Sequence, residues 1–263
     1  MDVLKYNREA WDAQVEQGNM WTMPVTPDEV AAARQGDWEI IVTPDKPVPR
    51  EWFPEKIEGS DILGMASGGG QQGPILAALG ANVTILDNSP NQLAQDKMVA
   101  EREGMTIRMV QGDMADMHPL EDNSFDLVIN PVSVVFVPDV RPVWKEAFRV
   151  LRPGGALVTG FCNPAVFIFD VAASEDRREL IVRHKLPYSD LNDLNEEERK
   201  RFSDRNEPLE YGHTWDDLVG GQLDAGFLLA GLYEDNWHPD GKKEVPLANY
   251  MDMFVMTRSI KPL

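Results

Sequence analysis

The stretch ILGMASGGGQQGPILAALGANVTILDNSP, residues Ile62 to Pro90, decides the fold class. A short apolar run leads into a glycine-rich loop, and a second apolar run ends at Asp87. Gly68 to Gly73 matches the pattern G-x-G-x-x-G, which predicts a strand, a loop, a helix and a second strand. Glycines let the backbone approach a ligand, and the start of the helix favours a carboxylate or phosphate. NAD and other nucleoside cofactors fit this stretch equally well.

Strand and helix patterns alternate through the centre of the chain. Apolar runs predict five parallel strands, at Ile62–Met65, Val83–Leu86, Thr106–Val110, Phe125–Ile129 and Ala156–Gly160. A capping box at Ser89 predicts a helix that ends near Glu103, and a second helix is expected from Asp139 or Val140 to Arg149. Two later apolar runs predict the last strands, at Phe227–Tyr233 and Met251–Thr257. The fold class is therefore α/β, with a doubly wound, mostly parallel, seven-stranded Rossmann-like sheet and helices on both faces.

The chain of 263 residues is expected to form a single domain in four parts. Residues 1–58 form an N-terminal extension with short helices near 3–16 and 27–35, and residues 59–161 form the core. Residues 162–212 form an insert after the fifth strand, with an apolar first half and a charged, solvent-exposed helix in its second half. Residues 213–263 supply a C-terminal helix and the last two strands.

The composition excludes several classes of protein. A net charge of −19 argues against nucleic acid as a partner. The N-terminus shows no signal peptide, and no apolar run is long enough to span a membrane. Cys162 is the single cysteine, so we expect a reducing, cytoplasmic location. Cys162 and the four histidines show no metal-ligand spacing, which predicts no metal.

Three further motifs follow the glycine loop in order. Gln111-Gly112-Asp113-Met114 follows the third strand, Asn123-Ser124-Phe125-Asp126-Leu127-Val128 opens the fourth, and Leu151-Arg152-Pro153-Gly154-Gly155 precedes the fifth. Over roughly residues 50–161, this series resembles the class I S-adenosylmethionine-dependent methyltransferases. The small-molecule group similar to the ubiquinone/menaquinone C-methyltransferases is the nearest in pattern.

The resemblance implies that S-adenosylmethionine is the cofactor. The glycine loop would wrap its methionine part, Asp87 would bind the ribose hydroxyls, and Asp113 would take the adenine amino group. The residues implied in cofactor binding are Ala66, Ser67, Gly68, Gly70, Gln72, Asp87, Asn88, Gly112, Asp113, Met114, Asn130 and Val132. The chain departs from the family at Gly64, where an acidic residue is usual, and at Ala66, where glycine is usual.

The family places the substrate above the cofactor, beneath an N-terminal lid and the insert. Tyr6, Asn7, Trp11, Trp21 and Thr22 are therefore lid candidates, and Tyr211 is a substrate contact. Tyr6 and His213 are candidate catalytic residues, although packing alone would also explain the aromatic residues and His213. Methyl transfer is mostly a matter of alignment and water exclusion.

The predicted reaction is methyl transfer to a small molecule, which the acidic chain favours as neutral or cationic. Two alternatives stay open: a non-catalytic cofactor-binding protein on the same fold, and an NAD-dependent oxidoreductase. The missing acid at Gly64 supports the first. The second leaves the Gly112-Asp113 pair and the Pro-Gly-Gly turn unexplained.

Overall fold

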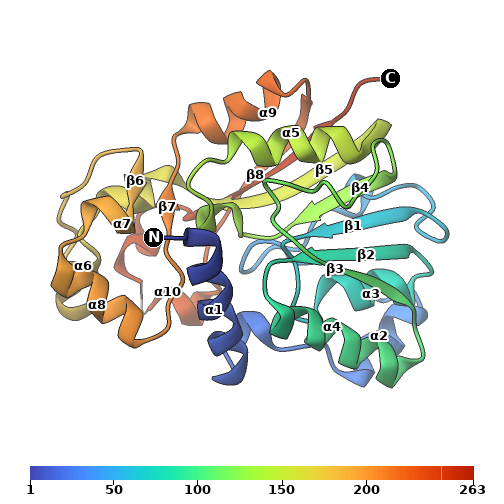
Figure 1. Ribbon diagram of the computed structural model, residues 1–263, viewed down its shortest axis with the longest axis horizontal. Helices are drawn as coiled ribbons and strands as arrows, with labels where there is room; N and C mark the ends of the chain where they lie inside the picture. The colour runs from blue at the N-terminus through green and yellow to red at the C-terminus, as the bar shows by residue number, and fades with distance from the viewer. Residues whose placement is uncertain (244) are drawn as a thin grey trace.

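A seven-stranded sheet forms the centre of the computed structural model, which describes residues 1–243 and 245–263. The strand order is β3-β2-β1-β4-β5-β9-β8, and β1 to β5 are parallel. β9 runs antiparallel to both β5 and β8 (Figure 1). The strands are β1 (Asp61–Met65), β2 (Asn82–Asp87), β3 (Ile107–Gln111), β4 (Phe125–Asn130), β5 (Leu151–Cys162), β8 (Leu228–Asp235) and β9 (Phe254–Ile260). The predicted doubly wound sheet is thus confirmed.

Helices cover both faces of this sheet. They are α2 (Pro27–Arg34), α3 (Gln72–Ala78) and α4 (Pro90–Glu103) on one face, and α5 (Arg141–Val150) and α9 (Gly221–Asp224) on the other (Figure 1). Successive residues of β1 point to opposite faces of the sheet. Ile62 packs in the core under α3, and Leu63 packs in the core under α5. Each face of a mostly parallel sheet is buried in this way, which explains its continuous apolar strands.

Three local predictions need correction. β5 begins at Leu151, because Leu151 pairs with Phe125 and an irregularity in the register carries the Pro-Gly-Gly turn within the strand. The last two strands lie further along the chain than predicted, because pairing starts where Phe254 meets Cys162 and Asp235. At α4, Ser89 accepts a bond from the Gln92 amide, but the capping box is incomplete because Gln92 Oε1 has no partner.

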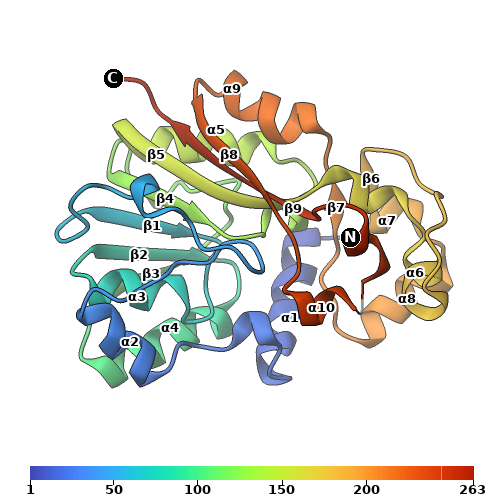
Figure 2. The ribbon, with the colours of Figure 1, turned by 180° about the vertical axis from the view of Figure 1, so that it is seen from behind.

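The segments outside the sheet gather at the carboxyl ends of its parallel strands. α1 (Val3–Glu16) lies between the sheet and the insert (Figure 1). The insert contains η4 (Pro164–Ile168), α6 (Val171–Arg177), α7 (Asp190–Asp193), α8 (Glu196–Asp204) and the two-stranded pair β6 (Tyr188–Ser189) and β7 (Tyr211–Gly212). α10 (Pro239–Lys242) belongs to the segment between β8 and β9 (Figure 2). The remaining short turns are η1 (Met20–Thr22), η2 (Arg50–Trp52), η3 (Val134–Phe136), η5 (Asp216–Gly220) and η6 (Pro246–Asn249).

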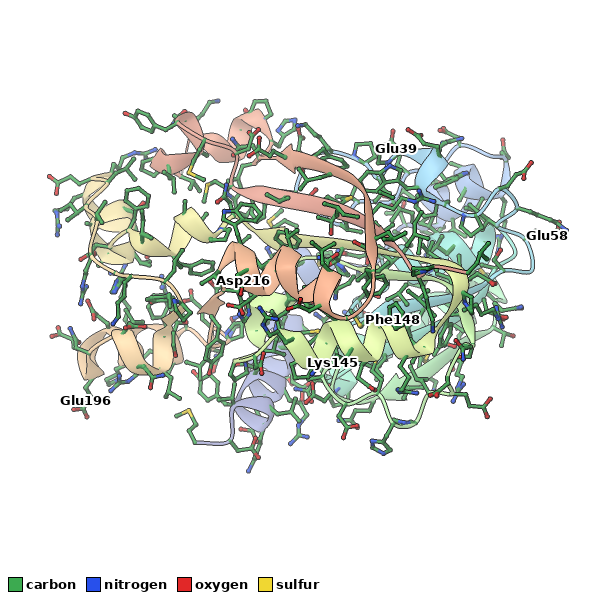
Figure 3. All side chains as sticks on the ribbon, turned by 90° about the horizontal axis from the view of Figure 1, so that it is seen from above. Glu39, Glu58, Lys145, Phe148, Glu196 and Asp216 are labelled. Carbon is green, nitrogen blue, oxygen red and sulfur yellow. The ribbon has the colours of Figure 1, made fainter. Side chains whose placement is uncertain are left out.

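The insert forms one end of the molecule. Glu196 of α8 and Glu58, just before β1, lie at opposite ends (Figure 3). As predicted, the charged α8 helix has no buried residue. Arg201 of α8 forms ion pairs with Glu175 and Asp176 of α6, at 3.0 Å and 2.8 Å. The insert is thus attached to the sheet domain as a separate wall above the strand ends.

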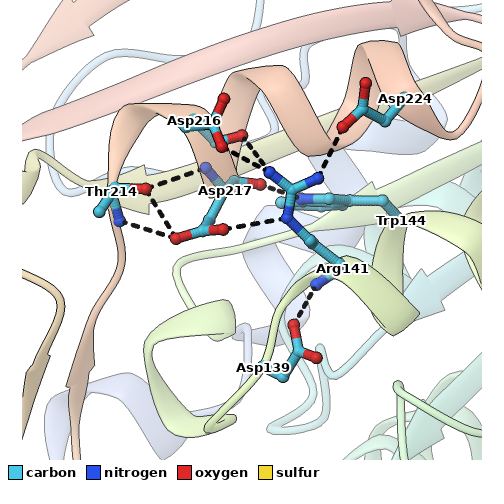
Figure 4. Close-up of polar contacts among 7 residues, drawn as sticks. All are labelled: Asp139, Arg141, Trp144, Thr214, Asp216, Asp217 and Asp224. Carbon is cyan, nitrogen blue, oxygen red and sulfur yellow. Dashed lines mark hydrogen bonds and ion pairs between the residues drawn. The ribbon is translucent and has the colours of Figure 1, made fainter.

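Arg141, the first residue of α5, joins this helix to the segment that follows β7. Its guanidinium donates to Asp216, Asp217 and Asp224 at 2.6–3.0 Å (Figure 4). Trp144, one turn later, donates its indole N–H to the Asp217 carbonyl at 2.9 Å. These bonds fix the end of the insert against the sheet domain, and with it the residues just before η5.

Candidate active site

The glycine loop follows β1 and requires unusual backbone angles. Gly69 and Gly70 have φ of +116° and +72°, which favour glycine. A Cβ at Gly70 would lie 2.8 Å from the Pro24 Cβ. The close packing of the N-terminal segment on the loop therefore requires glycine at this position, whether or not a ligand is bound. Val25 also donates to the Gly70 carbonyl at 2.9 Å. The segment around residues 20–25 therefore packs directly on the loop.

Two buried carboxylates hold the loop from behind. Asp87 accepts from the Gly68 amide through Oδ2 and from the Ser89 amide through Oδ1, both at 2.9 Å. Asp96, on α4, accepts from the Gly69 amide at 3.0 Å. Burial raises the pKa of Asp87 to about 6. Burial, opposed by amide bonds and assisted by the charge of Asp87, raises the pKa of Asp96 to about 8.

Sequence reasoning missed Asp96. The only signal in the sequence is an acid at helical spacing from Leu93 and Ala100, on the face that α4 turns toward the sheet. Such a position is apolar in most helices, so a carboxylate there needs a partner from another element. The amide of Gly69 is that partner, and the sequence does not reveal which helix will lie behind the loop.

Ser67 occupies the space in which an acidic side chain at position 64 would lie. A Cβ on Gly64 would meet the Ser67 Oγ at 2.2 Å. The Ser67 hydroxyl is buried and has no hydrogen-bond partner. The packing of Ser67 thus requires glycine at position 64, and no residue of β1 (Asp61–Met65) brings a carboxylate to this place.

A cavity of about 990 Å³ opens beside the loop and extends beneath the N-terminal segment. Of the predicted cofactor residues, those that line it are Ala66, Gly68, Gln72, Asp87, Asn88, Gly112, Asp113, Met114 and Val132. The lid candidates Trp11 and Trp21 line it as well. Residues separated by more than a hundred positions are therefore brought to one cavity at the carboxyl ends of the strands, where doubly wound sheets bind their ligands.

The walls on the far side are mainly apolar. Aromatic side chains come from four segments: Trp11 and Trp21 before the sheet, Phe136 after β4, Phe167 in the insert, and Trp237 and Phe254 near the end of the chain. Trp21 and Trp237 meet with ring centroids 5.8 Å apart. The N-terminal and C-terminal parts of the chain thus close one side of the cavity together.

Comparison with known proteins agrees with this geometry. The family model described as a methyltransferase domain matches residues 63–159. A Bacillus subtilis (strain 168) protein named "Uncharacterized methyltransferase YbaJ" is 48% identical over 259 residues, which cover 98% of each chain. This chain belongs to the class I S-adenosylmethionine-dependent methyltransferases.

Other similarities are partial or limited to the fold. Sterol 24-C-methyltransferase erg6 of Aspergillus fumigatus is 41% identical over 101 residues, which cover 37% of this chain and 26% of that protein. The crystal structure of an S-adenosylmethionine-dependent methyltransferase from Mesorhizobium loti superposes with a TM-score of 0.61 at 19% identity, over 80% of this chain and 94% of that one. Family membership favours the methyltransferase prediction over both alternatives.

Not every predicted site residue of this methyltransferase reaches the cavity. The predicted site residues that lie outside the cavity lining are Ser67, Gly70, Asn130, Tyr6, Tyr211 and His213. Asn130 is fully buried, where it donates to the Met65 carbonyl and accepts from Thr159. Its bonds fix the spacing of β1, β4 and β5 beneath the cavity. Gln72 does line the cavity, but its amide donates to the Ile41 carbonyl at 2.8 Å.

The two candidate catalytic residues are engaged elsewhere. The Tyr6 hydroxyl donates to the Glu207 carbonyl at 3.3 Å. His213 is buried, with Nε2 bonded to the Val134 carbonyl at 3.0 Å, and burial lowers its pKa. Tyr6 therefore joins α1 to the insert, and His213 joins the residue after β7 to η3. The general acid–base roles predicted for them gain no support from these contacts.

Asn7 anchors α1 to two other segments of the chain. Its side-chain amide donates to the carbonyls of Phe136 and Leu209 and accepts from the Leu209 amide at 2.8 Å. At the other side of α1, Asp12 accepts from the Ser89 hydroxyl at 2.6 Å. α1 therefore connects the insert to the loop after β2, across the edge of the cavity.

Glu210 lines the cavity, and sequence reasoning missed it. It directly precedes β7, and burial followed by the charges of Asp190 and Glu207 raises its pKa to about 8. Within the described part of the chain, no cluster of His, Cys, Asp or Glu is arranged to hold a metal ion. No helix among these residues is long and apolar enough to cross a membrane.

Proposed function

We propose that this methyltransferase transfers a methyl group from S-adenosylmethionine to a small-molecule acceptor bound in the cavity. The observation that carries the proposal is the continuity of the cavity, which runs from the predicted cofactor residues to the aromatic walls. Both reactants can therefore occupy one space.

The residues at the strand ends suit the cofactor. Each Asp87 oxygen accepts one backbone N–H, and a carboxylate has capacity for about four bonds, so two ribose hydroxyls can still be bound. Asp113 lines the adjoining part of the cavity, where an adenine amino group can donate to its carboxylate. Met114 lies beside it and offers an apolar surface to the ring.

The cofactor supplies an activated methyl group when bound, so the protein has to align the acceptor and exclude water. Trp11, Trp21 and Trp237 line the cavity from the side that would otherwise face solvent. Their rings can also attract the positive charge of the cofactor, a contact worth ~0.5–2 kcal/mol.

Calorimetry with S-adenosylhomocysteine tests this proposal. We expect binding to the native chain and a loss of roughly 1.5–3 kcal/mol in Asp87→Ala, the range for charge-assisted hydrogen bonds. Because Asp87 also holds the Gly68 amide, the ribose contact is isolated by comparing adenosine with 2′,3′-dideoxyadenosine. The native preference for adenosine should vanish in Asp87→Ala and persist in Glu55→Ala, an exposed control. Binding of NAD in place of S-adenosylhomocysteine would contradict the proposal.

A further inference from the structure

The charged residues that line the cavity are all acidic. Glu29, Asp37, Glu39, Asp87, Asp113 and Glu210 contribute carboxylates, and no Lys, Arg or His lines the cavity among the described residues. Asp87 and Asp113 belong to the predicted cofactor end, and Glu29, Asp37 and Glu39 are exposed. Glu210 alone is a partly buried acid on the side of the aromatic walls, so it is the group that an acceptor would meet.

The backbone of Glu210 is fixed on both sides. Its amide donates to Asp190 Oδ2 at 2.7 Å, and its carbonyl accepts from the Asp190 amide at 3.1 Å. Leu209, just before it, is held by Asn7 of α1. A side chain anchored by the insert and by the lid keeps its position without help from its own carboxylate.

No hydrogen bond or ion pair occupies the Glu210 carboxylate in the described structure, so it differs from the other buried acids. Asp87 and Asp96 each accept backbone amides, and Asp190 accepts from the Tyr188 hydroxyl at 2.8 Å. This carboxylate is only partly buried and lines the cavity, so a ligand there can donate a charge-assisted hydrogen bond to it. The free carboxylate thus indicates a donor in the ligand.

Glu210 lies near the expected place of methyl transfer. Its charge contributes, after burial, to the raised pKa of the Cys162 thiol, so the two groups are close. Cys162 ends β5 and packs in the same apolar cluster as Val132, which follows β4. The resemblance to the family implies that Asn130, Pro131 and Val132, at the end of the fourth strand, lie under the reactive sulfur of the cofactor. The carboxylate is thus on the acceptor side of the reacting atoms.

We propose that the acceptor is a primary or secondary amine, and that the Glu210 carboxylate binds its ammonium form and takes its proton. This rests on the proposed function. An N–H bond of the ammonium breaks, its electron pair stays on nitrogen, and the proton forms an O–H bond with Glu210. The nitrogen lone pair then forms the N–CH₃ bond, while the methyl–sulfur bond breaks and leaves its electron pair on sulfur. The aromatic walls suit the cation before it loses its proton.

Calorimetry with three probes of one shape tests the proposal. Benzylamine, benzyl alcohol and benzoate are titrated into the full chain saturated with S-adenosylhomocysteine. We expect benzylamine to bind at least ~10-fold more tightly than benzyl alcohol, since hydrogen bonds to charged groups are about twice as strong as neutral ones. Benzoate should not bind. Glu210→Gln should remove the preference for the amine, and Glu39→Gln, the same change at an exposed lining position, should retain it.

Proton release provides a readout that does not depend on the variants. The groups around Glu210 are Asp190, Glu207, Tyr188 and Cys162, none of which supplies a positive charge. With a pKa of about 8, the Glu210 carboxyl is mostly protonated at pH 7, and binding of an ammonium ion must displace that proton. Titrations in buffers with different ionisation heats should show release in the native chain and none in Glu210→Gln.

The outcomes separate the two proposals. Equal affinity for benzylamine and benzyl alcohol, retention of the amine preference in Glu210→Gln, or absence of proton release in the native chain would each overturn the amine proposal. If S-adenosylhomocysteine failed to bind the native chain, the proposed function would fail instead. An unchanged affinity of Glu210→Gln for S-adenosylhomocysteine shows that this variant is folded.

Discussion

The carboxylates at the two ends of the cavity differ in their hydrogen-bond partners. At the cofactor end, Asp87 and Asp96 already accept backbone amides of the glycine loop and the residues after β2. At the acceptor end, Glu210 has a fixed backbone and a carboxylate without a partner in the described structure. The first arrangement holds the glycine loop in its conformation before a ligand binds. The second leaves the Glu210 carboxylate able to accept a hydrogen bond from a ligand. The comparison teaches that buried acids of similar pKa have different roles, which only their partners reveal.

The N-terminal segment is the part of the molecule that joins the two ends. It contacts the cofactor end through Val25 and the Gly70 carbonyl, and the acceptor end through Asn7 and Leu209. It also completes the cavity with Trp11 and Trp21. Its removal therefore tests whether the two ends depend on one another.

Deletion of residues 1–25 should have the largest effect. The bonds lost at the cofactor end join the segment to Gly70, Gln71 and Asn88. Because these bonds hold residues of the glycine loop and of the cavity lining in place, we expect S-adenosylhomocysteine binding to weaken by about tenfold or more, the equivalent of ~1.4 kcal/mol. Acceptor binding should weaken further, because the aromatic walls lose Trp11 and Trp21. Calorimetry measures both, with circular dichroism to confirm folding.

Trp21→Ala provides a milder version of this deletion. It removes a half-exposed ring of the wall and leaves the backbone contacts of the segment in place. We expect it to weaken acceptor binding more than cofactor binding, which calorimetry with the acceptor probes and with S-adenosylhomocysteine measures. If the deletion of residues 1–25 left the affinities for S-adenosylhomocysteine and for the acceptor unchanged, these residues would only pack against the domain.

The sequence predicted the glycine loop and the acid after the second strand, which line one end of the cavity, because one continuous motif builds them. The glycine loop and Asp87 lie within 30 residues, and short-range patterns specify strands and helix caps. The sequence does not predict the role of Asp96, because that role depends on which face of α4 lies behind the loop. Asn130 is predicted to contact the cofactor from its place at the end of the fourth strand. In the structure its side chain bonds instead to Met65 of β1 and Thr159 of β5.

The acceptor end could not be predicted in the same way. Its walls come from residues before the sheet, from the insert and from the segment between β8 and β9. Glu210 stands in an acidic stretch with no motif, and its burial depends on packing against Asp190 and Cys162. Long-range packing of this kind leaves no local periodicity, so Tyr6 and His213 were more conspicuous candidates.

A pH series tests the loop-holding role at the cofactor end. The folded-state pKa of Asp96 is raised from 3.8 to about 8, so between these values the folded protein holds a proton that the unfolded chain has lost. Its contribution to stability therefore falls as the pH rises through this window. Asp96→Asn keeps an acceptor for the Gly69 amide and removes the ionisation.

We expect the stability of Asp96→Asn relative to the native protein to rise by at least ~1.4 kcal/mol between pH 5 and pH 8, the equivalent of one pKa unit. Urea unfolding at both pH values measures the difference. Glu101→Gln, an exposed change on the same helix, is the control and should show no such trend. A constant difference across this range would mean that Asp96 is ionised throughout and that the loop holds a charged carboxylate.

The smallest expected effect concerns Ala66, where the chain departs from the family's usual glycine. Ala66 has φ of +47°, in the left-handed region that costs a residue with a Cβ about 1–2 kcal/mol. Glycine would relieve this cost but lose ~0.5–1 kcal/mol through the greater freedom of the unfolded chain. The net prediction for Ala66→Gly is a gain of up to ~1 kcal/mol in the free energy of unfolding.

Asn206→Gly supplies the matched control, because Asn206 has φ of +54° and asparagine tolerates this region better than alanine. Its gain in urea unfolding should be smaller than that of Ala66→Gly. Ala66 also packs against the core beneath α5, and its methyl group lines the cavity. If Ala66→Gly destabilised the protein, that packing would outweigh the backbone cost, and alanine at this position would be a stabilising feature of the loop around Ser67.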